Sequence, residues 1–138
     1  MQRNIGFETE GLDKTTLTDH KWLAFIVRQI VSNAVKYSKE HKEIHISTTI
    51  DNLGHLVLSI KDEGVGISQA DLPRIFEKSF TGRVGRESAA STGMGLYLAK
   101  NSAEKLGINI NVTSEIGVGS TFSLQFPIQN EMQEILGR

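Results

Sequence analysis

The spacing of apolar residues predicts a long amphipathic helix in the first third of the chain. From Asp19 to about Ser38, apolar and aromatic residues recur every three or four positions, which places them on one face of an α-helix. Asp19 directly precedes this pattern and is a residue type that accepts hydrogen bonds from the free N–H groups of a first helical turn. The recurring positions are Trp22, Phe25, Ile26, Ile30, Ala34 and Tyr37.

Period-two alternation predicts two β-hairpins. The runs "EIHISTTI" and "HLVLSIKD" flank the turn-forming "DNLG", so Ile44, Ile46, Thr48 and Ile50 share one face and Leu56, Leu58 and Ile60 share another. Nearer the C-terminal end, "INVTS" and "STFSLQF" flank the turn "EIGVG". Residues 3–9 are modestly apolar and are compatible with a further short strand.

A second helix and a long loop lie between the hairpins. Residues 77–92, "EKSFTGRVGRESAAST", have almost no periodicity and predict an irregular loop, which in a compact domain is usually functional or mobile. "GMGLYLAKNSAEKLG" then predicts a helix that packs Leu96, Leu98, Ala99 and Ala103 and stops at Gly107. The order of elements predicts an α+β sandwich, a mostly antiparallel sheet with helices on one face.

Composition narrows the kind of partner. The 138 residues suit one compact domain, 1–138, and the formal net charge of −1 provides no overall field for binding nucleic acid or anionic membranes. The absence of cysteine excludes disulfides and thiolate metal sites, which favours a cytoplasmic setting. The longest apolar run, "WLAFIV", is too short to span a bilayer, and the start of the chain lacks a signal-peptide pattern.

A polar row interrupts the apolar face of the first helix. At 100° per residue, Gln29, Asn33, Lys36 and Tyr37 fall in the same sector as Ile26 and Ile30. Buried amides without partners cost about 1–3 kcal/mol each, so a ligand is expected there unless the row lies at the solvent edge of the stripe. Asparagine oxygen suits magnesium, lysine suits phosphate and a tyrosine ring suits a base.

The stretch "DEGVGI" places an acidic group at a strand end. The register of Leu58 and Ile60 carries Asp62 inward, where a carboxylate needs a donor. Gly64 and Gly66 allow a flat ligand to approach the backbone closely, so the exocyclic amino group of a purine is a suitable partner for Asp62. An ordinary turn aspartate is the alternative, since short patterns of this kind are common.

Glycines also precede the second helix, in "STGMGL". The free N–H groups and the positive dipole end of a helix form an anion site, and the preceding loop adds Lys78, Arg83 and Arg86. This combination suits a triphosphate covered by a lid, although a plain glycine-containing helix start is the alternative. Three elements in this order, each suited to a different part of one nucleotide, are less probable by chance than any one of them.

The four segments "QIVSNAVKYS", "DEGVGI", "IFEKSF" and "STGMGLYLAK" resemble the N, G1, F and G2 boxes of the ATP-binding catalytic domain of sensor histidine kinases. These are Bergerat-fold ATPases, a superfamily that also includes gyrase, MutL and heat-shock chaperones. The resemblance runs from about Asp19 to Phe126. The stretch "TDHKWLAFIVRQIVSNAVKYS" is similar to small intramembrane-sensing kinases that respond to bacitracin and related antimicrobial peptides in Gram-positive bacteria.

The resemblance implies a Bergerat-type α/β sandwich with a mobile ATP lid and a role for each matching residue. The implied catalytic residues are Gln29, Asn33 and Lys36, with Asn33 as the Mg²⁺ ligand and Lys36 as a phosphate contact. Asp62 is implied as the acceptor of the adenine amino group and Phe76 and Phe80 as anchors of the lid. The remaining implied nucleotide contacts are Tyr37, Gly64, Gly66, Ile67, Lys78, Gly93, Met94, Gly95, Leu96 and, more weakly, Thr121.

Two departures limit what the resemblance implies. Hydrolytic members of the superfamily carry a glutamate as base for water where this chain has Gln29, and an amide cannot take that proton. A histidine kinase also needs a phosphoacceptor histidine followed by an acidic residue and soon by proline, a context that none of the four histidines has. We expect His20, His41, His45 and His55 to face solvent.

The resemblance implies a domain that binds Mg·ATP and donates the γ-phosphoryl group to a histidine on a separate, upstream dimerisation domain. Its further partner would be a response regulator, and no nucleic acid is expected to bind. The isolated domain is expected to be a monomer on the cytoplasmic side of a homodimeric membrane protein. The alternatives are an ATP-gated interaction module of the gyrase or MutL type and a serine kinase of the anti-sigma-factor type. A dinucleotide oxidoreductase is disfavoured because Gln69 occupies the place of the third glycine in a G-x-G-x-x-G motif.

Overall fold

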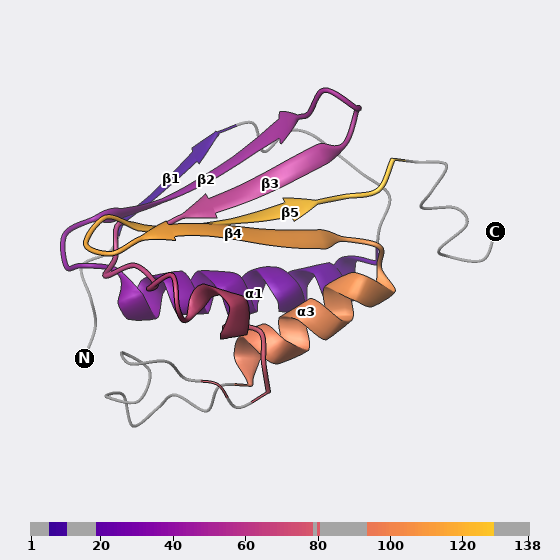
Figure 1. Cartoon of the computed structure of the whole chain (residues 1–138). Coiled ribbons are helices and arrows are strands. Elements are labelled where there is room, and N and C mark those ends of the chain that lie inside the picture. Colours follow the sequence, from indigo (N-terminus) through magenta and orange to yellow (C-terminus); the bar gives the residue numbers. More distant parts are fainter. Residues whose placement is uncertain (1–5, 11–18, 79, 81–93, 129–138) are drawn as a thin grey trace.

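Two layers make up the fold, a five-stranded sheet and a pair of helices packed against one of its faces (Figure 1). The computed structural model describes residues 6–10, 19–78, 80 and 94–128. The elements follow in the order β1 (Gly6–Glu10), α1 (His20–Tyr37), β2 (Glu43–Ile50), β3 (Leu56–Lys61), the short 3₁₀ helix η1 (Leu72–Arg74), α3 (Gly95–Lys105), β4 (Asn109–Glu115) and β5 (Gly119–Gln125).

The sheet has the strand order β1-β2-β3-β5-β4. The pairs β2–β3, β3–β5 and β5–β4 are antiparallel, and β1 lies parallel to β2 at the edge. The predicted α+β sandwich with a mostly antiparallel sheet is therefore confirmed. The two predicted hairpins are β2–β3 and β4–β5, and the described part of the weak pattern in residues 3–9, from Gly6 on, lies in β1.

The core lies between the sheet and the helices. From α1, Ile26, Ile30 and Ala34 are buried, which confirms the predicted apolar face. They pack with Ile60 of β3 and Phe122 of β5, which are register partners on the helix-facing side of the sheet. Such side chains stabilise a fold by about 1.5–3 kcal/mol each when fully buried.

The start of α1 is fixed as predicted. The side chain of Asp19 accepts hydrogen bonds from the backbone N–H groups of Lys21 at 3.0 Å and Trp22 at 3.2 Å. These bonds satisfy two of the N–H groups that a first helical turn leaves free. Trp22 itself lies at the edge of the apolar face, edge-on to Phe25, and 49 % of it is exposed.

Two predicted placements are wrong. Leu98 of α3 is 40 % exposed, whereas Ala99 and Ala103 are buried, because the face of α3 that packs is centred on the small residues. His55 does not face solvent, since only 18 % of its side chain is accessible and its Nδ1 lies 3.4 Å from Oδ2 of Asp51. No helix in the described ranges is both long and apolar enough to cross a bilayer.

Candidate nucleotide-binding site

The α1 helix places the predicted polar row beside the core. Gln29, Asn33, Lys36 and Tyr37 are all half-buried, so they occupy the border of the apolar stripe. Lys36 lies near its neighbour, with Nζ 5.3 Å from the centroid of the Tyr37 ring. This border position leaves the amide and ammonium groups accessible to a ligand that binds at the edge of the helix layer.

The end of α1 is joined to the loop that follows β3. Ser38 forms an isolated antiparallel bridge with Gly64, and the N–H of Val65 donates to the carbonyl oxygen of Tyr37 at 3.2 Å. A Cβ atom on Gly64 would collide with that same carbonyl oxygen. Only glycine fits between the helix end and the loop, which explains the first glycine of "DEGVGI". The same contact brings the segments "QIVSNAVKYS" and "DEGVGI" together.

Asp62 is the buried carboxylate of this junction, with 3 % of its surface exposed. Its Oδ1 accepts hydrogen bonds from the backbone N–H groups of Gly64 at 2.9 Å and Ser120 at 3.2 Å. Within the described ranges no residue donates a hydrogen bond to Oδ2. Burial raises the pKa of Asp62, and the two backbone N–H groups offset part of that rise. The chain thus holds one oxygen of a buried carboxylate rigidly and leaves the other for a donor.

The start of α3 lies against α1. A Cβ atom on Gly95 would be 2.7 Å from Oε1 of Gln29, so the first residue of α3 touches the predicted polar row. Met94 and Leu96, on either side of Gly95, are half-buried, and Leu96 packs against the core. The N-terminal end of α3, where backbone N–H groups are free, therefore lies beside the row, as expected for a phosphate site.

Phe76 and Phe80, the predicted lid anchors, both contact described residues, whereas the lid itself lies outside the described part of the chain. Phe76 lies edge-on to Phe122 of the core at a ring separation of 6.3 Å, with Lys100 Nζ 5.2 Å from its ring centroid. Arg74 stacks on Phe80 at 4.5 Å. Lys78 is exposed. Gly93 and residues 81–92 lie outside the described residues, so their predicted contacts stay predictions.

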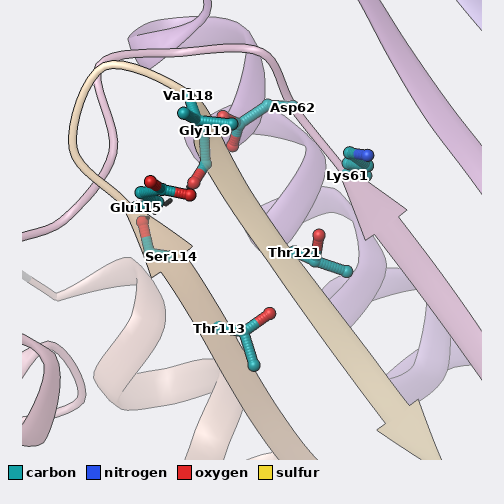
Figure 2. Close-up of a pocket in the computed structure, with 8 residues that line it drawn as sticks. All are labelled: Lys61, Asp62, Thr113, Ser114, Glu115, Val118, Gly119 and Thr121. Carbon is teal, nitrogen blue, oxygen red and sulfur yellow. Dashed lines mark hydrogen bonds between the residues drawn. The ribbon is translucent and has the colours of Figure 1, made fainter.

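Thr121, a predicted nucleotide contact, lies on the face of β5 that points away from the helices. Along β5, Ser120, Phe122 and Leu124 are buried toward the helices, so Thr121 projects from the opposite face, level with Lys61 of β3. Thr121 lines a cavity of about 230 Å³ together with Lys61, Thr113 and Asp62. Figure 2 shows where these side chains lie along the strands. Ser120 shares the face of Asp62 and bonds to it, so Ser120 replaces Thr121 as the candidate. The sequence could have indicated Ser120. Phe122 is the large apolar residue expected in the core, and Ser120, two positions away on the same strand, shares its face.

Magnesium can be tested against the side chains present. Among the described residues no group of three or more acidic or histidine side chains could hold a metal ion by itself. A single neutral amide, Asn33, is nevertheless a suitable partial ligand for an ion that keeps several waters and binds substrate phosphates. The donor set therefore fits an ion that arrives with a nucleotide and not a resident metal centre.

Comparison with known proteins agrees with this geometry. Residues 18–130 match the family model described as histidine kinase-, DNA gyrase B- and HSP90-like ATPase. The chain belongs to this family. It is 48 % identical over 136 residues to the sensor protein BceS of Bacillus subtilis, and 48 % identical over 133 residues to the sensor protein kinase GraS of Staphylococcus aureus. These alignments cover 99 % and 96 % of this chain. Within the family the chain is thus an ATP-binding domain of the sensor kinase type.

Solved structures share the fold. The mycobacterial sensor histidine kinase MprB matches with a TM-score of 0.73 and 25 % identity over 91 % of this chain and 86 % of that chain. Full-length ShkA in complex with AMPPNP matches with a TM-score of 0.74 and 24 % identity over 91 % of this chain and 26 % of that one. The chain spans only about 40 % of BceS and 38 % of GraS, so those relatives are much longer proteins.

Proposed function

We propose that this domain binds Mg·ATP and donates the γ-phosphoryl group to a histidine on a separate dimerisation domain of its parent protein. The observation that carries the proposal is Asp62, a buried carboxylate with Oδ1 fixed by two backbone N–H groups and Oδ2 left for a donor. An adenine amino group is a donor of the right kind, whereas the 6-oxo group of guanine would face the carboxylate with an acceptor.

Each remaining part of the site contributes one function. Gly64 gives the base access beside the end of α1, because a side chain there would occupy the space between Asp62 and Tyr37. Lys36 and the N–H groups at the start of α3 are groups suited to bind triphosphate oxygens, which supports their assignment to the phosphates. Asn33 would hold Mg²⁺ through its amide oxygen, and the ion would neutralise phosphate charge.

Phosphoryl transfer to an imidazole requires positioning and charge neutralisation more than covalent work by the protein. A nitrogen of the accepting histidine forms a bond to the γ-phosphorus. The bond from that phosphorus to the β–γ bridging oxygen breaks, and ADP leaves with the electron pair. Gln29 supports this direction over hydrolysis, because its amide cannot remove a proton from water. The proposal extends to a membrane-anchored homodimeric parent, with this domain on the cytoplasmic side, and to a response regulator that receives the phosphoryl group.

A calorimetric titration tests the binding step. The chain is titrated with a non-hydrolysable ATP analogue, with and without Mg²⁺, and with the matching GTP analogue. We expect binding that prefers adenine and strengthens with Mg²⁺, and equal affinity for the two bases would contradict the role of Asp62. Addition of the parent's dimerisation domain with ATP then tests transfer, which should label a histidine. Rapid ATP hydrolysis by this chain alone would favour the ATP-gated module, and labelling of a protein serine would favour the anti-sigma-factor type of kinase.

A further inference from the structure

A hydroxyl group joins three separate segments next to Asp62. Ser114, near the end of β4, is half-buried and has its Oγ 2.7 Å from the backbone nitrogen of Ile67, 3.0 Å from the carbonyl oxygen of Gly119 and 2.7 Å from Oγ of Ser120. Because a hydroxyl has one proton, Ser114 accepts from Ile67 N–H and donates either to Gly119 or to Ser120. It therefore ties the loop after Asp62 to the β4–β5 hairpin. Figure 2 shows Ser114 and Gly119 on the two strands of this hairpin, with Asp62 nearby.

The loop 62–67 is held at both ends by different kinds of contact. At its start, the N–H of Asp62 donates to the carbonyl oxygen of Ser120 at 2.9 Å. In its middle, the N–H of Gly117 donates to the carbonyl oxygen of Val65 at 3.0 Å. At its end, Ile67 is bound by the side chain of Ser114. Of these contacts, only the one at Ile67 depends on a side chain from another strand.

We propose that Ser114 is a positioning residue for recognition of the nucleotide base. This inference rests on the proposed function, since it assumes that Asp62 accepts from an adenine amino group. By holding Ile67, the Ser114 hydroxyl fixes the far end of the loop whose near end carries Asp62 and Gly64. Loss of the hydroxyl leaves the Ile67 N–H without its acceptor and loosens the far end of the loop. The backbone bonds of Asp62 and Val65 remain, so Oδ2 of Asp62 keeps its place but is held less precisely.

The test replaces Ser114 by alanine and measures base discrimination. The chain and its Ser114→Ala variant are titrated with Mg²⁺ and non-hydrolysable analogues of ATP and of purine riboside triphosphate, which lacks the 6-amino group. We expect affinity for the ATP analogue to fall about threefold to tenfold, the effect of one hydrogen bond, with a smaller fall for the analogue without the amino group. Amide exchange at Ile67 should accelerate in the same variant. A general loss of stability would leave the ratio of the affinities for the two analogues unchanged. It would also accelerate exchange at many amides and not at Ile67 alone.

A matched control is available on the other face of the sheet. Ser123 of β5 is half-buried and its Oγ lies 3.5 Å from that of Ser59, so Ser123→Ala removes a comparable hydroxyl pair away from Asp62. This variant should keep the affinity ratio of the unmodified chain. If Ser114→Ala does not fold, Ser114→Cys keeps a side chain of the same shape, slightly larger, while weakening the hydrogen bond, and it should show the same loss of discrimination to a smaller extent.

The outcomes separate this inference from the proposed function. If the unmodified chain discriminates between the two analogues and the Ser114 variants discriminate equally well, Ser114 does not position the site and the proposed function stands. If the unmodified chain does not discriminate between them, Asp62 does not read the base and both proposals fail. Reduced discrimination in the Ser114 variants alone, with faster exchange at Ile67, supports the positioning role.

Discussion

Gly95 begins α3 directly against the side chain of Gln29, because a Cβ atom at position 95 would lie 2.7 Å from Oε1 of that glutamine. The atom in the way is the end of a flexible side chain. We therefore expect Gly95→Ala to displace the Gln29 amide at moderate cost and to gain part of the helix propensity of alanine, about 0.5–1 kcal/mol. The net change in the free energy of unfolding should stay within about 1 kcal/mol.

A double-mutant cycle checks this relationship. Gly95→Ala should be more favourable in a Gln29→Ala background, with a coupling free energy of about 0.5 kcal/mol or more in denaturant unfolding. Ser32→Ala on the exposed side of α1 serves as control, because in the described part of the chain no other residue approaches that Cβ position within 4 Å. Additive effects of Gly95→Ala and Gln29→Ala would show that the two residues do not touch.

Gly66 combines a left-handed backbone with a close approach, and a second glycine separates the two effects. Gly66 has a φ of 77° and a Cβ atom there would collide with the carbonyl oxygen of Glu115. Gly117 has a φ of 82°, and no atom lies within 4 Å of its Cβ position. We expect Gly117→Ala to destabilise the domain by about 1–2 kcal/mol through backbone strain alone. Gly66→Ala should destabilise it by about 3 kcal/mol or more, since backbone must also move.

Equilibrium unfolding in urea measures both variants. The difference between them isolates the contact of the loop after Asp62 with the end of β4. Equal destabilisation would mean that this loop can move away from Glu115 freely, contrary to its hydrogen bonds with Ser114 and Gly117.

Local patterns predicted the elements, because periodicity along the chain is enough to define a helix face or a strand. Asp19 and the stripe of Ile26 and Ile30 gave α1 within one residue at each end. The boxes also predicted which segments meet, since Gly64 lies at Tyr37 and Gly95 at Gln29. Partners of a strand depend on distant segments, so the parallel pairing of β1 with β2 could not be read from its own residues.

The wrong predictions have a common physical origin. The resemblance implies a contact at Thr121, whereas strand alternation places Thr121 on the outer face and Ser120 beside Asp62, a shift of one residue. Leu98 was placed inside because it is apolar, yet the side of α3 that packs is set by where α1 lies. His55 is sheltered by its contact with Asp51, which comes from the folded turn.

Asp51 joins the β2–β3 turn to β5. Its Oδ1 accepts from the backbone N–H groups of Leu53 and His55, each at 2.9 Å, and its Oδ2 accepts from Nε2 of Gln125 at 2.9 Å. The His55 backbone N–H first, and then the Gln125 amide, lower the pKa of Asp51 from 3.8 to about 2. Because the folded pKa is depressed, the stabilisation is complete above the unfolded pKa and is lost as the pH falls from about 4 toward 2.

Unfolding free energies measured from pH 2 to 6 test this linkage. Asp51→Asn should be less stable than the unmodified chain above pH 5, and the gap between the two should narrow as the pH falls below 4. A gap that stays constant over the whole range would mean that the ionised carboxylate contributes nothing beyond its shape.

Asp62 should show the opposite pH dependence, because burial raises its pKa. A group whose folded pKa is raised contributes stability that is fully present below its unfolded pKa, near 3.8, and lost as the pH rises through the folded value. At neutral pH the ionised carboxylate therefore costs stability. The amide oxygen of Asp62→Asn can still accept from Gly64 and Ser120, so we expect this variant to be at least as stable as the unmodified chain at pH 7 and to gain nothing at pH 3.

The same substitution should weaken nucleotide binding. An asparagine amide puts N–H donors where Oδ2 would accept from the adenine amino group, so affinity for a non-hydrolysable ATP analogue should fall by about 1–3 kcal/mol. Calorimetric titration at pH 7, together with unfolding at pH 3 and 7, measures both effects in one protein. Preserved stability with lost affinity would identify Asp62 as a group kept for binding at the expense of folding. Lower stability with unchanged affinity would make Asp62 a structural residue and remove the observation on which the proposed function rests.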